Sequence, residues 1–170
     1  MMKTLLLSRV KALLFCMVMM VSGLVQASWD EAGVAIEGAT QQMLGLMEDE
    51  TLLEEAQEDQ LVAEIDKILT PVVDFDYIAK VVMGKYYRRA SAEERIKFSE
   101  VFRTTLLKTY ALAMVGFKIE KYEMIPPRDQ SPHPKKQIVS MNVIAADGSK
   151  FTLVYYMKKG DGEWRLVNAL

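Results

Sequence analysis

The chain has 170 residues, with 21 basic and 23 acidic side chains and a net charge of −2. This balance argues against nucleic acid as a partner and against binding to an anionic membrane surface by charge alone. The single cysteine, Cys16, lies close to the N-terminus, so the rest of the chain forms no internal disulfide and has to fold on its apolar core.

The first 27 residues predict a secretory signal. Three basic residues precede an apolar run over residues 12–21, and small side chains at Val25 and Ala27 suit a signal peptidase. The run is shorter than the ~20 residues of a membrane span. We expect cleavage after Ala27, a periplasmic location and one domain over residues 28–170; an uncleaved anchor is the alternative. Without that signal, 18 basic and 23 acidic side chains leave a net charge of −5.

Hydrophobic spacing predicts four helices after the signal, over residues 28–47, 51–69, 74–84 and 91–116. The start of the second helix is placed at Thr51, with Glu54 three residues later, and the acidic residues 48–50 form the connection before it. Asp74 is expected to cap the third helix, and Ser91 with Glu94 forms a capping box for the fourth.

The fourth helix has the clearest periodicity. Apolar and aromatic residues recur at spacings of three and four, which places them on one helical face that another element must cover. The residues of this face are Phe98, Val101, Phe102, Thr105, Leu106, Tyr110, Ala113 and Phe117.

After Gly116 the pattern alternates, as in half-buried strands. Strands are predicted over residues 117–125, 137–145, 150–158 and 163–170, with glycine-containing turns before the third and fourth. Helices followed by a four-stranded meander predict an α+β fold: N-terminal helices packed on one face of a curved antiparallel sheet, in an NTF2-like, cone-shaped arrangement.

Residues suited to catalysis are scarce. His133, the only histidine, lies between two prolines in a predicted loop, where a general base would lack rigid support. One histidine and no cysteine beyond the signal cannot form a zinc site, and no glycine-rich phosphate loop occurs. We therefore expect no enzymatic activity, no catalytic residue, no bound metal and no cofactor.

Flexible and aromatic apolar side chains are plentiful instead. Seven methionines lie beyond residue 27. Six aromatic residues are predicted on the facing surfaces of the fourth helix, of the short connection before it (residues 86–89) and of the sheet. Such side chains suit an apolar pocket, with ordinary core filling as the alternative. The six are Tyr86, Phe102, Tyr110, Phe151, Tyr155 and Trp164.

Several stretches also carry a family resemblance: Val73-Asp74-Phe75, Ile78-Ala79, residues 82–91 (VMGKYYRRAS), Glu94-Arg95, Phe98, Phe102, Tyr110-Ala111 and residues 162–168 (GEWRLVN). In these residues the chain resembles the MlaC, or toluene-tolerance, family of periplasmic phospholipid-binding proteins. The resemblance covers most of the chain from about residue 61 to residue 170. Its motifs are structural and not catalytic.

The resemblance implies a carrier with phospholipid as its cargo. Its partners would be an inner-membrane ABC transporter complex with an MCE-domain subunit and an outer-membrane lipoprotein and porin complex, and its role the maintenance of outer-membrane lipid asymmetry. Family members continue past the Trp164 strand into further helices. For a chain ending at Leu170 we therefore expect a pocket open on one side or a shortened form of the carrier.

The lipid contacts are predicted from residue type and from the side of the helix or strand on which each residue lies. Tail contacts are expected from Val82, Met83, Tyr86, Phe102, Leu106, Tyr110, Met114, Met141, Val143, Phe151, Leu153, Tyr155 and Trp164. Contacts to the headgroup phosphate are expected from Lys85, Arg88 or Arg89. The alternative from another class is an interaction module that binds a partner protein through the acidic residues 48–50 or through an exposed last strand.

Overall fold

The computed structural model describes residues 28–129 and 131–170, and the predicted signal over residues 1–27 lies outside this part. A helix over residues 28–48 is followed by helical elements and then by strands. In order, these are η1 (Glu55–Gln57), α2 (Glu58–Leu69), α3 (Phe75–Met83), η2 (Gly84–Tyr86), α4 (Ala92–Val115), β1 (Ile119–Ile125), β2 (Lys136–Ala145), β3 (Lys150–Lys159) and β4 (Trp164–Ala169).

The four strands form an open antiparallel sheet in the order β1-β2-β3-β4. Gly148 and Gly162 lie in the two tight connections with φ angles of 83° and 100°, which favour glycine. The register shifts between Ile119 and Lys121 and again between Tyr156 and Met157, and such irregularities bend a sheet. The predicted α+β fold class is confirmed.

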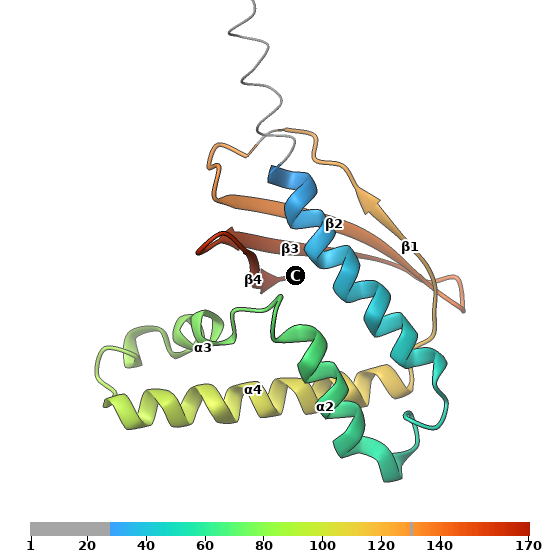
Figure 1. Cartoon of the computed structure of the whole chain (residues 1–170), viewed down its shortest axis with the longest axis horizontal. Coiled ribbons are helices and arrows are strands. Elements are labelled where there is room, and N and C mark those ends of the chain that lie inside the picture. Colours follow the sequence, from blue (N-terminus) through green and yellow to red (C-terminus); the bar gives the residue numbers. More distant parts are fainter. Residues whose placement is uncertain (1–27, 130) are drawn as a thin grey trace, which may run out of the picture.

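The helix over residues 28–48 joins the two layers of the molecule, because it crosses the sheet and then reaches the other helices (Figure 1). Its first half buries Ala32 and Ile36 against Val139, Met157 and Trp164 of the sheet, which together form the sheet cluster. Its second half contributes partly buried apolar side chains to a separate group of buried residues, which belong to α2, α4 and the start of α3. That helical cluster consists of Leu61, Ile65, Val73, Phe75, Leu107, Ala111 and Met114.

The predicted helix starts at Asp74 and Ser91 are confirmed. The Asp74 carboxylate accepts a hydrogen bond from the Tyr77 N–H at 3.0 Å. Ser91 Oγ accepts from the Glu94 N–H at 3.1 Å, and the Glu94 carboxylate accepts from the Ser91 N–H at 2.7 Å. Gly84 ends α3 with a φ of 53° and a ψ of −123°, a backbone conformation that favours glycine but differs from the predicted left-handed helical one.

We expect Ser91→Ala to lower the free energy of unfolding by about 1 kcal/mol, because it leaves a first-turn N–H without its acceptor. Glu94→Gln is the matched control, since a Gln side chain still accepts from the Ser91 N–H. Urea unfolding measures both variants. Equal losses in the two would contradict the role given to the Ser91 hydroxyl.

The predicted start of the second helix at Thr51 is wrong. The Asp49 carboxylate accepts hydrogen bonds from the Thr51 hydroxyl at 2.6 Å and the Thr51 N–H at 3.1 Å, which hold a turn at this point. A short side chain that binds its neighbours' backbone competes with helix formation. Regular α-helix therefore begins only at Glu58, after η1.

The predicted inward face of α4 is also wrong in part. The buried residues of α4 are Leu107, Ala111 and Met114, which pack in the helical cluster. Val101 and Tyr110, predicted to face inward, are about half exposed. The C-terminal half of α4 carries apolar side chains on nearly every side, so residue spacing alone does not settle which face is covered.

Candidate functional site

Four aromatic side chains gather where the C-terminal half of α4 approaches the sheet: Tyr110, Phe117, Phe151 and Tyr155, here called the aromatic patch. The rings of Phe117 and Phe151 meet edge to face, with 5.6 Å between their centroids. Tyr110 and Phe151 are each 46% exposed, and Phe117 is 36% exposed. The patch therefore offers solvent-accessible apolar surface from both layers of the fold.

Tyr155 is the least exposed member of the patch, and its surroundings change its acidity. Burial raises the pKa of Tyr155 above its ordinary value, and the nearby Tyr110 hydroxyl contributes to the same rise. The neutral phenol is therefore favoured in the folded protein. The effect of Tyr110 also shows that α4 and β3 present these two side chains to a common region.

We expect this shift to appear as a pH dependence of stability. A folded-state pKa above the unfolded value near 10 gives stability that is complete below pH 10 and is lost as the pH rises further, by at most about 1.4 kcal/mol per pH unit. Tyr155→Phe should lack this part of the loss. Urea unfolding of both proteins at pH 9 and pH 11 measures the difference, and identical pH dependences would contradict the assignment.

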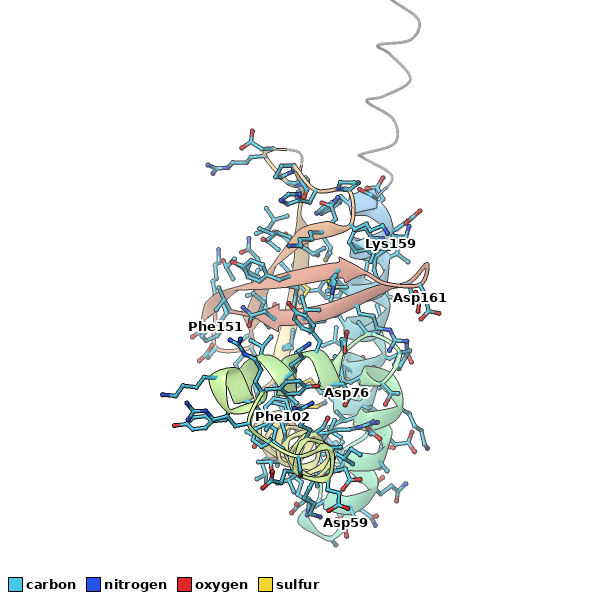
Figure 2. All side chains as sticks on the ribbon, turned by 90° about the vertical axis from the view of Figure 1, so that its left-hand side faces the viewer. Asp59, Asp76, Phe102, Phe151, Lys159 and Asp161 are labelled. Carbon is cyan, nitrogen blue, oxygen red and sulfur yellow. The ribbon has the colours of Figure 1, made fainter. Side chains whose placement is uncertain are left out.

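The predicted tail contacts fall into three groups. Four are core residues: Met114 in the helical cluster, Trp164 in the sheet cluster, and Met141 and Val143 buried in β2. Two are exposed on α3 and η2, namely Val82 and Tyr86. The remaining seven lie half-buried or in the aromatic patch: Met83, Phe102, Leu106, Tyr110, Phe151, Leu153 and Tyr155. Figure 2 shows Phe151 on the sheet and Phe102 in the helical layer below it.

Phe117 belongs to the aromatic patch although it was not among the predicted contacts. Its spacing from Tyr110 continued the predicted apolar face of the long helix, and this was the available signal. In the structure, residue 117 lies just beyond the end of α4, where the chain turns toward β1.

The predicted headgroup residues lie far from the aromatic patch. Lys85, Arg88 and Arg89 are exposed and precede the N-terminus of α4, whereas Phe117 follows its C-terminus. A helix of 24 residues separates its two ends by about 36 Å. Figure 1 shows α3 at one end of the helical layer and the passage into β1 at the other. The headgroup role of these three residues stays a prediction.

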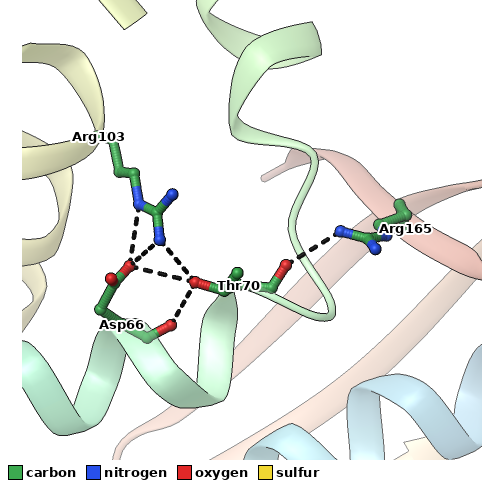
Figure 3. Close-up of polar contacts among 4 residues, drawn as sticks. All are labelled: Asp66, Thr70, Arg103 and Arg165. Carbon is green, nitrogen blue, oxygen red and sulfur yellow. Dashed lines mark hydrogen bonds and ion pairs between the residues drawn. The ribbon is translucent and has the colours of Figure 1, made fainter. Parts of the chain in front are cut away.

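A hollow of about 460 Å³ lies between α3, α4 and β4 and has both polar and apolar side chains in its walls. Next to it, Arg103 donates to the Asp66 carboxylate at 2.6 and 3.0 Å and to the Thr70 hydroxyl at 2.6 Å (Figure 3). Arg165 donates to the Thr70 carbonyl oxygen at 3.0 Å. These bonds tie α2 to α4 and β4, so we assign the group a structural role.

Side chains that could bind a metal ion lie apart from one another in the part of the chain that the structure describes. Among residues 28–129 and 131–170, no three His, Cys, Asp or Glu side chains lie close enough together to hold a metal ion. Two carboxylates at the hollow between α3, α4 and β4 have structural partners, because Asp74 caps α3 and Asp76 accepts a hydrogen bond from the Ser99 hydroxyl. No helix in the same two ranges is long and apolar enough to cross a membrane.

Comparison with known proteins shows the family of this chain. Residues 37–170 match the family model described as MlaC protein. The chain is 26% identical to a toluene tolerance protein of Pseudomonas putida over 136 residues, which cover 79% of this chain and 62% of that protein. It is 31% identical to the intermembrane phospholipid transport system binding protein MlaC of Haemophilus influenzae over 103 residues, covering 59% of this chain and 48% of that protein.

A solved structure shares the fold. It is the phospholipid-binding protein from Ralstonia solanacearum in complex with a phospholipid, with a TM-score of 0.73 and 19% identity, covering 82% of this chain and 76% of that chain. The chain spans about half to three fifths of the length of the two curated relatives. Because the family model matches well over half of its residues, the chain belongs to the MlaC family.

Proposed function

We propose that this protein binds phospholipid, with acyl chains lying on the aromatic patch between α4 and the sheet. The observation that carries the proposal is the placement of Tyr110 and Phe151, which belong to opposite layers and are each 46% exposed. A protein that takes up an acyl chain has to present apolar side chains that its own core does not cover. Half-buried Leu153 lies between Phe151 and Tyr155 on the same face of β3, and half-buried Leu106 of α4 packs against the helical cluster.

The energetics favour an apolar site over a strong headgroup site. Moving one methylene from water to an apolar site contributes about 0.8 kcal/mol, so an acyl chain of about fourteen methylenes represents on the order of 11 kcal/mol. Tails that were fully buried would therefore suffice for binding, and the polar headgroup could remain in water. This agrees with the distance between the aromatic patch and the basic residues before α4.

The family supports a proposal for the biological role. We propose a periplasmic carrier without enzymatic activity that moves phospholipid between an inner-membrane ABC transporter complex with an MCE-domain subunit and an outer-membrane lipoprotein and porin complex. The names of the Haemophilus and Ralstonia proteins support phospholipid as the cargo. The exposed position of His133 in its loop agrees with a protein that does no acid–base catalysis.

Mass spectrometry of lipids extracted from the purified protein tests this function. We expect phospholipid in near-equimolar amount, protected from exchange on dilution. Protein that carries no phospholipid, and takes none up from vesicles, would contradict the proposal. Salt-sensitive binding of a partner protein by lipid-free material would instead favour an interaction module.

A further inference from the structure

A second surface, separate from the aromatic patch, lies on the corner formed by α3, η2 and the turn before α4. Valine and tyrosine side chains are exposed there next to several cations. Val81, Val82 and Tyr86 are 58%, 57% and 60% exposed. The exposed basic residues of this corner are Lys80, Lys85, Arg88 and Arg89. These seven residues are here called the basic corner.

Two cations of this corner, Lys80 and Lys85, and the neighbouring Arg95 lie against aromatic rings. Lys80 Nζ lies 5.1 Å from the ring centroid of Tyr87, and the Arg95 guanidinium lies 4.4 Å from the same ring. Lys85 Nζ lies 5.3 Å from the ring centroid of Tyr86. These contacts hold positive charge at a surface that also presents tyrosine rings.

A hollow of about 520 Å³ opens within the corner, and its walls contain two cations and no carboxylate. It is lined by Tyr77, Lys80, Val81, Gly84, Tyr87 and Arg88. The carboxylates of Asp76 and Glu94, which accept hydrogen bonds from the Ser99 hydroxyl and the Ser91 N–H, are not among the residues that line it. The corner is therefore locally cationic, although residues 28–170 carry a net charge of −5.

We propose that the basic corner docks the protein on the surface of a bilayer that contains anionic phospholipid. Exposed aliphatic and tyrosine side chains next to lysine and arginine are the combination that binds the headgroup region, with apolar groups at the acyl boundary and cations at the phosphates. A uniformly acidic protein surface would complement the charge but would leave the exposed valines without apolar contact. This inference goes beyond cargo binding and does not depend on it.

Flotation with lipid vesicles tests the proposal on the full chain. Wild-type protein should float with vesicles of 70% phosphatidylcholine and 30% phosphatidylglycerol at low salt. It should bind them more weakly at high salt, and binding to pure phosphatidylcholine should be weaker still. Lys80→Glu combined with Arg88→Glu should lower the partition coefficient by at least about 30-fold, because each basic residue near the surface contributes roughly one factor of five or more.

A matched double variant controls for net charge. Lys135→Glu with Lys136→Glu makes the same change in charge at exposed positions in the loop before and at the start of β2, and it should bind as the wild type does. Val81→Gln should weaken binding several-fold, whereas Val34→Gln, at a valine that is 67% exposed on the first helix, should not.

Three outcomes would overturn the proposal: no preference for anionic vesicles, equal losses in the two double variants, or retention on polyglutamate without binding to vesicles. The last would identify an acidic protein as the partner. Lipid recovered with the purified protein reports separately on cargo binding. Val81→Gln, at an exposed residue that is not among the predicted cargo contacts, should retain it, so failure of docking and failure of the proposed function are distinguishable.

Discussion

Replacing both Tyr110 and Phe151 by aspartate is expected to remove bound phospholipid while leaving the protein folded. Each side chain is already 46% exposed, so a carboxylate at either position keeps contact with water in the lipid-free protein. An acyl chain laid across the patch would strip that water away. Burying an unpaired carboxylate is costly enough that lipid recovery should fall by about 100-fold or more. Mass spectrometry of extracted lipid measures the loss.

The chain offers a matched control for this double variant. Leu112→Asp with Ile138→Asp also places one carboxylate on α4 and one on the sheet, at side chains that are 63% and 50% exposed. Leu112 lies two residues beyond Tyr110, about 200° around the helix. Ile138 adjoins the buried Val139 and points to the opposite face of the sheet.

The control should retain phospholipid and the same circular dichroism spectrum as the wild type. Equal loss of lipid in both double variants would show that added charge, and not the aromatic patch, decides retention. Unchanged lipid in Tyr110→Asp/Phe151→Asp would place the acyl chains elsewhere. If only Tyr110→Asp/Phe151→Asp unfolds, the two side chains contribute to the stability of the core, which would contradict the role inferred from their exposure.

Local rules predicted much of the fold because the signals were local. Asp74 and Ser91 stand at helix starts where their own side chains bind the first turn, and Gly148 lies in a tight turn that needs a positive φ. None of these depends on a distant partner. The helix start predicted at Thr51 was wrong because the Asp49 carboxylate, which is equally close in the sequence, accepts a hydrogen bond from the Thr51 hydroxyl and holds a turn there instead.

Which side of α4 is buried depends on residues that are far away in the sequence. Its neighbours α2 and α3 pack against one side, and they select Leu107 and Ala111 for burial, although Tyr110 and Val101 satisfied the same spacing rule. For the site, residue type drew attention to Tyr110, Phe151 and Tyr155, which the structure brings together. Residue type could not separate them from Met141 and Trp164, which fill the core.

The Leu166 side chain couples the two parts of the fold, so its truncation should weaken the contact between them. It packs against both the helical cluster and the sheet cluster. Its backbone also joins the layers, because its N–H donates to the Val72 carbonyl at 2.7 Å and its carbonyl accepts from the Asp74 N–H at 3.0 Å. Leu166→Ala preserves those backbone bonds and removes only the shared apolar contact.

We expect Leu166→Ala to lower the free energy of unfolding by about 2–4 kcal/mol, through lost transfer energy and the cavity left behind. Leu170→Ala is the control: its backbone pairs with Val154, but its side chain is 70% exposed, so the cost should stay within about 0.5 kcal/mol. Urea unfolding followed by tryptophan fluorescence and by circular dichroism measures both. If the clusters form one cooperative unit, the two probes will coincide in the variant as in the wild type. Separate transitions in Leu166→Ala would mean that the Leu166 side chain maintains the cooperativity of the two clusters. If Leu166→Ala lowers the free energy of unfolding no more than Leu170→Ala does, the two layers are held together by their backbone hydrogen bonds alone.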